Sequence, residues 1–225
     1  ELYMGSYDRA DEHLLEAGYE LERAGKSTTS VWVLRAEIAR RLKEYECADA
    51  RLDHALASLT AESTSRDKAE IYLVEADMAC DQGDETAART LLGKLKAEVG
   101  DRSDEYLRAA VVRTQGRIHM IESLYDAAAA DFAGEATIFR LAGSYGDMAR
   151  AMSREASAHS AAGRHGAAAE LYYRSARSLY SGGDYVAALE LVEKGLGEVA
   201  ADPRDRMRRR MVMLVEEIKS GLSQK

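Results

Sequence analysis

Residues 123–135 read SLYDAAAADFAGE, and this stretch shows the pattern that decides the fold. A small turn residue, Ser123, is followed by Tyr125, then by Ala128, and four positions later by the bulky Phe132. Residues four positions apart lie on one face of a helix, and a small residue there lets a neighbouring helix come close. The stretch is therefore predicted to begin a helix that packs tightly against another helix.

The same order recurs along the chain. The corresponding alanines, separated by 40, 38, 40 and 40 residues, are Ala10, Ala50, Ala88, Ala128 and Ala168. Four positions after each comes a mostly bulky residue: Leu14, His54, Leu92, Phe132 and Tyr172. Three positions further on, the same face continues with Ala17, Ala57, Leu95, Glu135 and Ser175. Self-similarity at a nearly fixed period indicates stacked repeats, each consisting of one pair of helices.

Helix-breaking residues divide each repeat into two helices. The breaks are expected near 25–29, 45, 60–65, 83, 100–103, 123, 143–146, 163, 182–183 and 202–203. This predicts an all-α superhelix, a single solenoid domain over residues 1–225 with about 11 antiparallel helices. Asp184 and Asp202 are expected to cap helices, and the segment 203–225 is expected to form a C-terminal capping helix that begins at Pro203.

At this point the chain resembles the tetratricopeptide repeat family. Gly5, Tyr7, Ala10, Leu14 and Ala17 match the second helix of that repeat, and residues 123–132 match it as well, with Glu135 as an exception. The family also places a small residue seven positions before the turn, where this chain has Ile38, Ala76, Gly116 and Ala156, so that only Ile38 does not fit. The family's usual repeat has about 34 residues. The period near 40 therefore implies longer helices.

The resemblance implies where a partner binds, because the first helices of such repeats line a concave groove. The groove-facing positions expected here include Leu73, Asp77 and six candidate binding residues, namely Trp32, Arg35, Arg113, Arg117, Arg150 and Arg154. Trp32 is interpreted either as an anchor in the groove or as a packing residue at the start of a helix. The arginines predict a positive patch suited to a carboxylate-rich peptide or a chain terminus. The chain contains no asparagine, which disfavours the family's asparagine-based clamp for chaperone termini.

Composition limits the other functions. The formal net charge is −8 and the pI is about 5.3, which disfavours a nucleic-acid-binding role. No apolar run is long enough to span a bilayer, so no transmembrane segment is expected. Without a visible leader the expected location is the cytoplasm, or the periplasm if a leader has been removed, because the sequence starts at Glu1 and is interpreted as part of a longer chain.

No motif nominates catalytic chemistry. Phosphate-binding glycine loops and nucleophile elbows are absent from the sequence, and Cys47 and Cys80 are expected to be buried apolar residues. His119 and His159 occupy equivalent positions in two repeats, but they lack the further ligands that a metal site requires. We expect neither an enzyme nor a cofactor. The run from Arg204 to Arg210 is interpreted either as a solvated capping face or as a patch for an acidic partner or anionic lipid.

The sequence thus predicts a scaffold that binds a protein or peptide in its groove. The alternative is an effector-sensing or oligomerisation module of a larger bacterial regulator, in which the groove takes a small effector or a second copy of the chain. The bacterial origin is inferred from the alanine- and arginine-rich composition.

Overall fold

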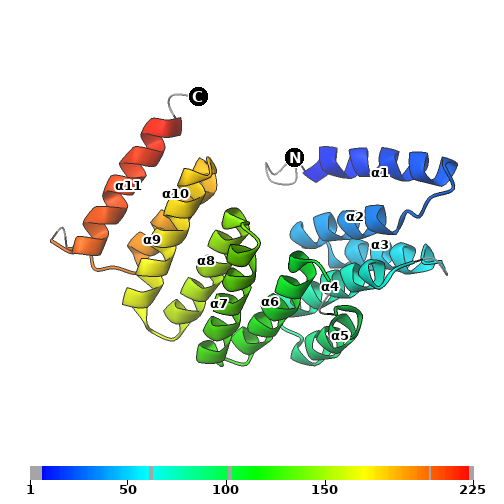
Figure 1. The fold of residues 1–225 in the computed structure, drawn as a ribbon, viewed down its shortest axis with the longest axis horizontal. Helices are drawn as coiled ribbons and strands as arrows, with labels where there is room; N and C mark the ends of the chain where they lie inside the picture. The colour runs from blue at the N-terminus through cyan, green and yellow to red at the C-terminus, as the bar shows by residue number, and fades with distance from the viewer. Residues whose placement is uncertain (1–6, 61–62, 101–102, 203, 223–225) are drawn as a thin grey trace. The chain divides into compact units, whose positions relative to one another are not determined.

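The computed structural model describes residues 7–60, 63–100, 103–202 and 204–222. Within these residues the chain forms 11 α-helices and no strand, which confirms the predicted all-α fold (Figure 1). The helices are α1 (Tyr7–Arg23), α2 (Thr29–Arg41), α3 (Tyr45–Ala57), α4 (Ser65–Gln82), α5 (Glu85–Glu98), α6 (Glu105–Ile121), α7 (Tyr125–Leu141), α8 (Tyr145–Ala161), α9 (His165–Ser181), α10 (Tyr185–Gly197) and α11 (Arg206–Leu222).

One turn geometry recurs between the helices. The residue at each turn has a positive φ angle, and the residue after it donates its backbone N–H to the carbonyl five positions earlier, as in Glu44 to Ala39 and Leu124 to His119. This bond satisfies a carbonyl that the end of a helix leaves unpaired. The turn residues are Gly25, Lys43, Gly83, Ser123, Gly143, Gly163 and Gly183. The turn conformation therefore recurs along the chain together with the pattern of buried helix faces.

The turn at Lys43 corrects the predicted register of the second repeat. Ala50, His54 and Ala57 were expected on the buried face, but all three are exposed. The buried residues are instead Ala48, Leu52 and Ala55, two positions earlier. The reason is that a lysine adopts the left-handed turn conformation, which glycine normally takes. In the corrected register the small residue seven positions before the turn is Ala36, so Ile38 is no longer an exception.

The same shift explains a second wrong prediction. Cys47 was expected to be buried, but it lies on the exposed side of α3, whereas Cys80 on α4 is buried as predicted.

Leu73 and Asp77, which were expected to face a groove, are also buried. They belong to α4, whose buried residues are distributed around the helix rather than along one stripe. That helix offers no exposed groove surface at these two positions.

The contacts within the chain group into two compact units, Glu1–Leu107 and Arg108–Lys225, with the boundary inside α6. In the first unit α2 packs against α1, α3 and α4, and α4 packs against α5. The core under α2, α3 and α4 includes Ala36, Ala48, Leu52, Ile71 and Met78. Small residues at the helix contacts allow this close packing.

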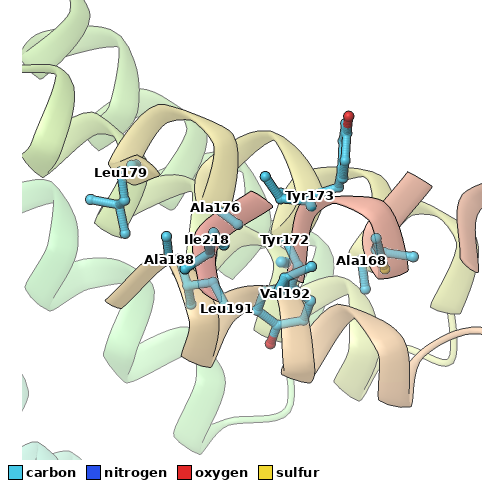
Figure 2. Packing of buried hydrophobic residues seen from close by; sticks show 14 residues of the cluster. Ala168, Tyr172, Tyr173, Ala176, Leu179, Ala188, Leu191, Val192 and Ile218 are labelled. Atoms are coloured by element: carbon cyan, nitrogen blue, oxygen red, sulfur yellow. The ribbon is translucent and has the colours of Figure 1, made fainter. Parts of the chain in front are cut away.

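In the second unit each helix from α7 to α10 packs against the next, α11 packs against α10 and α9, and neighbouring helices run antiparallel (Figure 1). One core cluster joins α9, α10 and α11. It includes Met211 and the labelled residues Tyr172, Ala176, Val192 and Ile218 (Figure 2). In the same view the Tyr173 side chain extends away from these residues, with its hydroxyl group outermost. Tyr173 thus connects the core of this unit with its surface.

The C-terminal helix begins later than predicted, at Arg206 rather than at Pro203, which itself lies outside the described residues. Asp205 caps this helix, because its carboxylate accepts the backbone N–H of Arg208 at 2.7 Å. Asp202 instead accepts the N–H of Arg204 in the preceding turn. The predicted cap at Asp184 is confirmed, since its side chain accepts the N–H of Ala187.

No helix in the described parts of the chain is both long enough and apolar enough to cross a membrane.

Candidate functional site

An arginine-lined cavity of about 870 Å³ opens on the second unit. It lies at the N-terminal end of α8, along α9, at the turn before α10 and against α11. Its charged and aromatic lining residues are Tyr145, Arg150, Tyr173, Arg174, Arg177, Asp184 and Arg210. Four arginines against one carboxylate make this lining strongly positive, although the chain as a whole carries a formal charge of −8.

Helical periodicity places the α9 residues in this cavity. Tyr172, Ala176 and Leu179 are buried in the core, so the intervening positions Arg174 and Arg177 face outward. These two arginines are one helical turn apart and share a side of the helix. Rigid packing of α9 thereby fixes the position of two cationic side chains at the cavity wall.

Arg150, the α8 residue of the lining, is held by carboxylates. Its guanidinium nitrogens lie 3.5 Å from Asp147 and 3.3 Å from Asp184. Asp184 also caps α10 with its other oxygen, so the same residue fixes the start of α10 and the position of Arg150. Much of the charge of Arg150 is therefore already balanced within the protein.

Tyr173 contacts two of the arginines that line the cavity, Arg210 and Arg177. The guanidinium of Arg210 on α11 lies 4.2 Å from the centre of the Tyr173 ring and donates a hydrogen bond to Glu170 at 3.3 Å. Arg177 donates a hydrogen bond to the Tyr173 hydroxyl at 3.4 Å. This bond is the main reason why the pKa of Arg177 is raised, so its positive charge is firmly retained.

Arg174 differs from the other three arginines. Within the described part of the chain it makes no hydrogen bond or ion pair. It does act on Glu155 of α8 at longer range, since burial raises the pKa of that carboxyl and the charge of Arg174 partly opposes the rise. Arg174 is thus an exposed cation whose hydrogen-bonding groups are available to a ligand.

Of the six residues predicted from the sequence, Arg150 alone lines this cavity. Arg154 lies further along α8 and hydrogen-bonds the buried carboxylate of Glu135. Arg113 and Arg117 are half-buried on α6, and each has an interaction partner.

Trp32 and Arg35 belong to the first unit. Trp32 stacks on His54 with ring centres 4.6 Å apart, and Arg35 lies 5.0 Å above the Trp32 ring. The Arg35 side chain, only 11% exposed, donates two hydrogen bonds to Asp11. The hollow beside Trp32 and Arg35 has a volume of about 20 Å³. Such a space is the size of one water molecule, which is too small for a side chain of a partner.

Sequence reasoning missed Tyr145, Tyr173, Arg174 and Arg177 as site residues. The prediction considered only the helices taken as the first of each pair. It did not include α9, which contributes six of the twelve lining residues. The run YYRSAR at 172–177, two tyrosines followed by two arginines one turn apart, was the available signal. Arg210 was noted as part of a basic run, but its neighbour Tyr173 was not foreseen.

The two repeat-related histidines have separate partners. His119 lies 2.7 Å from Asp131, and His159 accepts a hydrogen bond from Arg164 at 2.8 Å. In residues 7–60, 63–100, 103–202 and 204–222, no three histidine, cysteine or acidic side chains converge as metal ligands would.

No protein-family model matches the chain, and no curated protein matches it.

Proposed function

We propose that this protein is an interaction scaffold and that the cavity between α8, α9 and α11 binds a segment of a partner protein. The observation that carries the proposal is the lining itself. Arginine and tyrosine are the residue types that most often dominate binding energy at protein interfaces. Here four arginines and two tyrosines share one concave surface on rigidly packed helices.

The exposure of the aromatic residues supports this proposal. Tyr145 lines the cavity and is 62% exposed, although it is large and partly apolar. Tyr173 is almost fully buried, and its hydroxyl group lies outermost (Figure 2). The exposed ring of Tyr145 would become buried when a partner binds, whereas Tyr173 is already held in a fixed position by the surrounding residues.

The family suggested by the sequence is part of the same proposal. The recurring turns and the buried small residues Ala36, Ala76, Gly116 and Ala156 support a tetratricopeptide-like repeat with a longer period. Repeats of this kind are common supports for binding surfaces, but a fold alone does not assign a function.

The experiment is a peptide-array screen with the full chain as probe. The double variant R174E/R177E serves to locate the site. The matched control is R140E/K194E, which makes the same change in charge at exposed positions of the same unit outside the cavity. We expect the chain to select a subset of peptides, and we expect the first variant to lose that subset while the control keeps it. Equal selection by all three proteins would overturn the assignment of the cavity.

A second candidate function rests on the size of the cavity. A volume of about 870 Å³ falls within the range typical of small-molecule sites, roughly 300–1,000 Å³. An effector-sensing module would bind a small anion there instead of a peptide. A small anion that raises the melting temperature of the chain, in the absence of any selected peptide, would favour this alternative.

A further inference from the structure

We propose that the segment bound in this cavity is acidic and that Arg174 and Arg177 bind two neighbouring oxyanions on it. This inference rests on the scaffold function proposed above and specifies the chemistry of the partner. The oxyanions are the carboxylates of aspartate or glutamate side chains, which a planar guanidinium can hold with two parallel hydrogen bonds.

The four arginines of the cavity are not equivalent. Arg150 contacts two carboxylates, and Arg210 contacts Glu170 and stacks on Tyr173. Arg177 is bound to a neutral hydroxyl group, and Arg174 makes no hydrogen bond or ion pair within the described residues. Arg174 and Arg177 are therefore the two arginines of the cavity that make no hydrogen bond or ion pair to a carboxylate within the described residues, although Glu155 acts on Arg174 and Glu217 acts on Arg177 at longer range.

The position of this charge is unfavourable without a ligand. Like charges one turn apart on a helix repel each other, and Arg174 and Arg177 are such a pair. Arg150 and Arg210 add less to this repulsion, because carboxylates already pair with them. An acidic segment would relieve this repulsion, which makes its binding more favourable than binding to an isolated arginine pair.

The orientation of the segment follows from the wall carboxylate. Asp184 already pairs with Arg150, so this side of the cavity offers an acidic group little net positive charge. Acidic side chains are therefore directed to the α9 side, where Arg174 and Arg177 lie. The serine hydroxyls of Ser178 and Ser181 line the same side and are neutral.

The test measures fluorescence anisotropy of labelled peptides with the full chain. The probes are a glutamate-rich peptide, its glutamine counterpart, a phosphoserine counterpart and a lysine-rich counterpart. We expect the glutamate-rich peptide to bind at least about tenfold more tightly than the glutamine peptide. Tight binding of the phosphoserine peptide without binding of the glutamate peptide would overturn the assignment to carboxylates.

The variant R174Q/R177Q removes the two charges and keeps the side-chain length, and it should abolish this preference. R140Q, an exposed arginine outside the cavity, should leave it intact. Circular dichroism establishes that each variant is folded. Loss of binding in both variants would overturn the inference in favour of diffuse electrostatic attraction.

The remaining outcomes separate this inference from the function on which it rests. Equal binding of the glutamine and glutamate peptides would overturn the acidic preference but leave the scaffold function in place. A rise in melting temperature with free citrate, without binding of either acidic peptide, would overturn the scaffold function and favour an effector site. No difference between acidic and lysine-rich peptides overturns the inference outright.

Discussion

The carboxylate of Glu135 on α7, which has no exposed surface, accepts two hydrogen bonds from the guanidinium of Arg154 on α8. The Arg154 Nε atom lies 2.9 Å from one carboxylate oxygen of Glu135, and Nη2 lies 2.5 Å from the other. Glu135 occupies a helix position where other repeats have a small or apolar residue. Arg154 therefore neutralises the buried Glu135 carboxylate at a position where the repeat pattern places an uncharged residue.

We expect Arg154→Ala to destabilise the protein by about 3 kcal/mol, because it removes a positive charge and two hydrogen bonds from the buried Glu135 carboxylate. Urea unfolding followed by circular dichroism measures the effect. The double variant with Glu135→Ala as well should recover part of the loss, since no uncompensated charge then remains. Unchanged stability of the single variant would contradict a structural role for Arg154.

Gly116→Ala is expected to destabilise the second unit even though alanine favours helix by about 1 kcal/mol. An added Cβ at this position would lie 2.8 Å from Cε1 of the Phe132 ring and 3.1 Å from Cβ of Asp131. Gly93→Ala is the matched control, because no atom lies within 4 Å of its added Cβ. Thermal unfolding should show a lower melting temperature for the first variant and a higher one for the second.

Lys43→Gly is expected to stabilise the protein by about 1 kcal/mol, because a residue with a side chain is disfavoured in the left-handed conformation. Lys43 has a φ angle of 63°, and the equivalent turn residue Gly83 has 73°. Gly83→Lys is the reciprocal change and should lower stability by a similar amount, since the site has space for a Cβ. A destabilised Lys43→Gly variant would show that the lysine side chain contributes more than its backbone strain costs.

Glu155→Gln should change the pH dependence of stability. Burial raises the pKa of Glu155 above its usual value of 4.5, and Arg174 opposes part of that rise. As the pH rises above 4.5, the unfolded chain loses this proton first, so the folded state loses stability until the pH passes the raised pKa. The glutamine variant avoids this cost. It should therefore be more stable than the parent at neutral pH and show no advantage below pH 4.5.

Melting curves across this pH range test the prediction. A companion measurement is the pKa of Glu155 by NMR in the Arg174→Gln variant, where it should rise further because the opposing charge is gone. A pKa that stays the same would place Arg174 too far from Glu155 to act on it.

The sequence by itself determined the fold class, because the evidence for it is local. Alanine and a bulky residue at helical spacing, followed by a turn residue, can be read within one repeat, as Ala128 and Phe132 illustrate. The Asp184 cap was predictable for the same reason, since its bond partner Ala187 is only three positions away. The position of the Lys43 turn was not, because lysine gives no signal for a left-handed conformation.

Only the tertiary structure decided which arginines are available to a partner. Arg154 and Arg150 look alike in sequence, but one neutralises the buried Glu135, 19 positions away, and the other lines the cavity. Arg210 reaches Tyr173 because α11 packs against α9. Whether a charged side chain pairs with the protein or faces solvent depends on residues from other helices. Helical spacing within one segment does not indicate which residues of other helices lie beside an arginine. The packing of α8, α9 and α11 determines these neighbours.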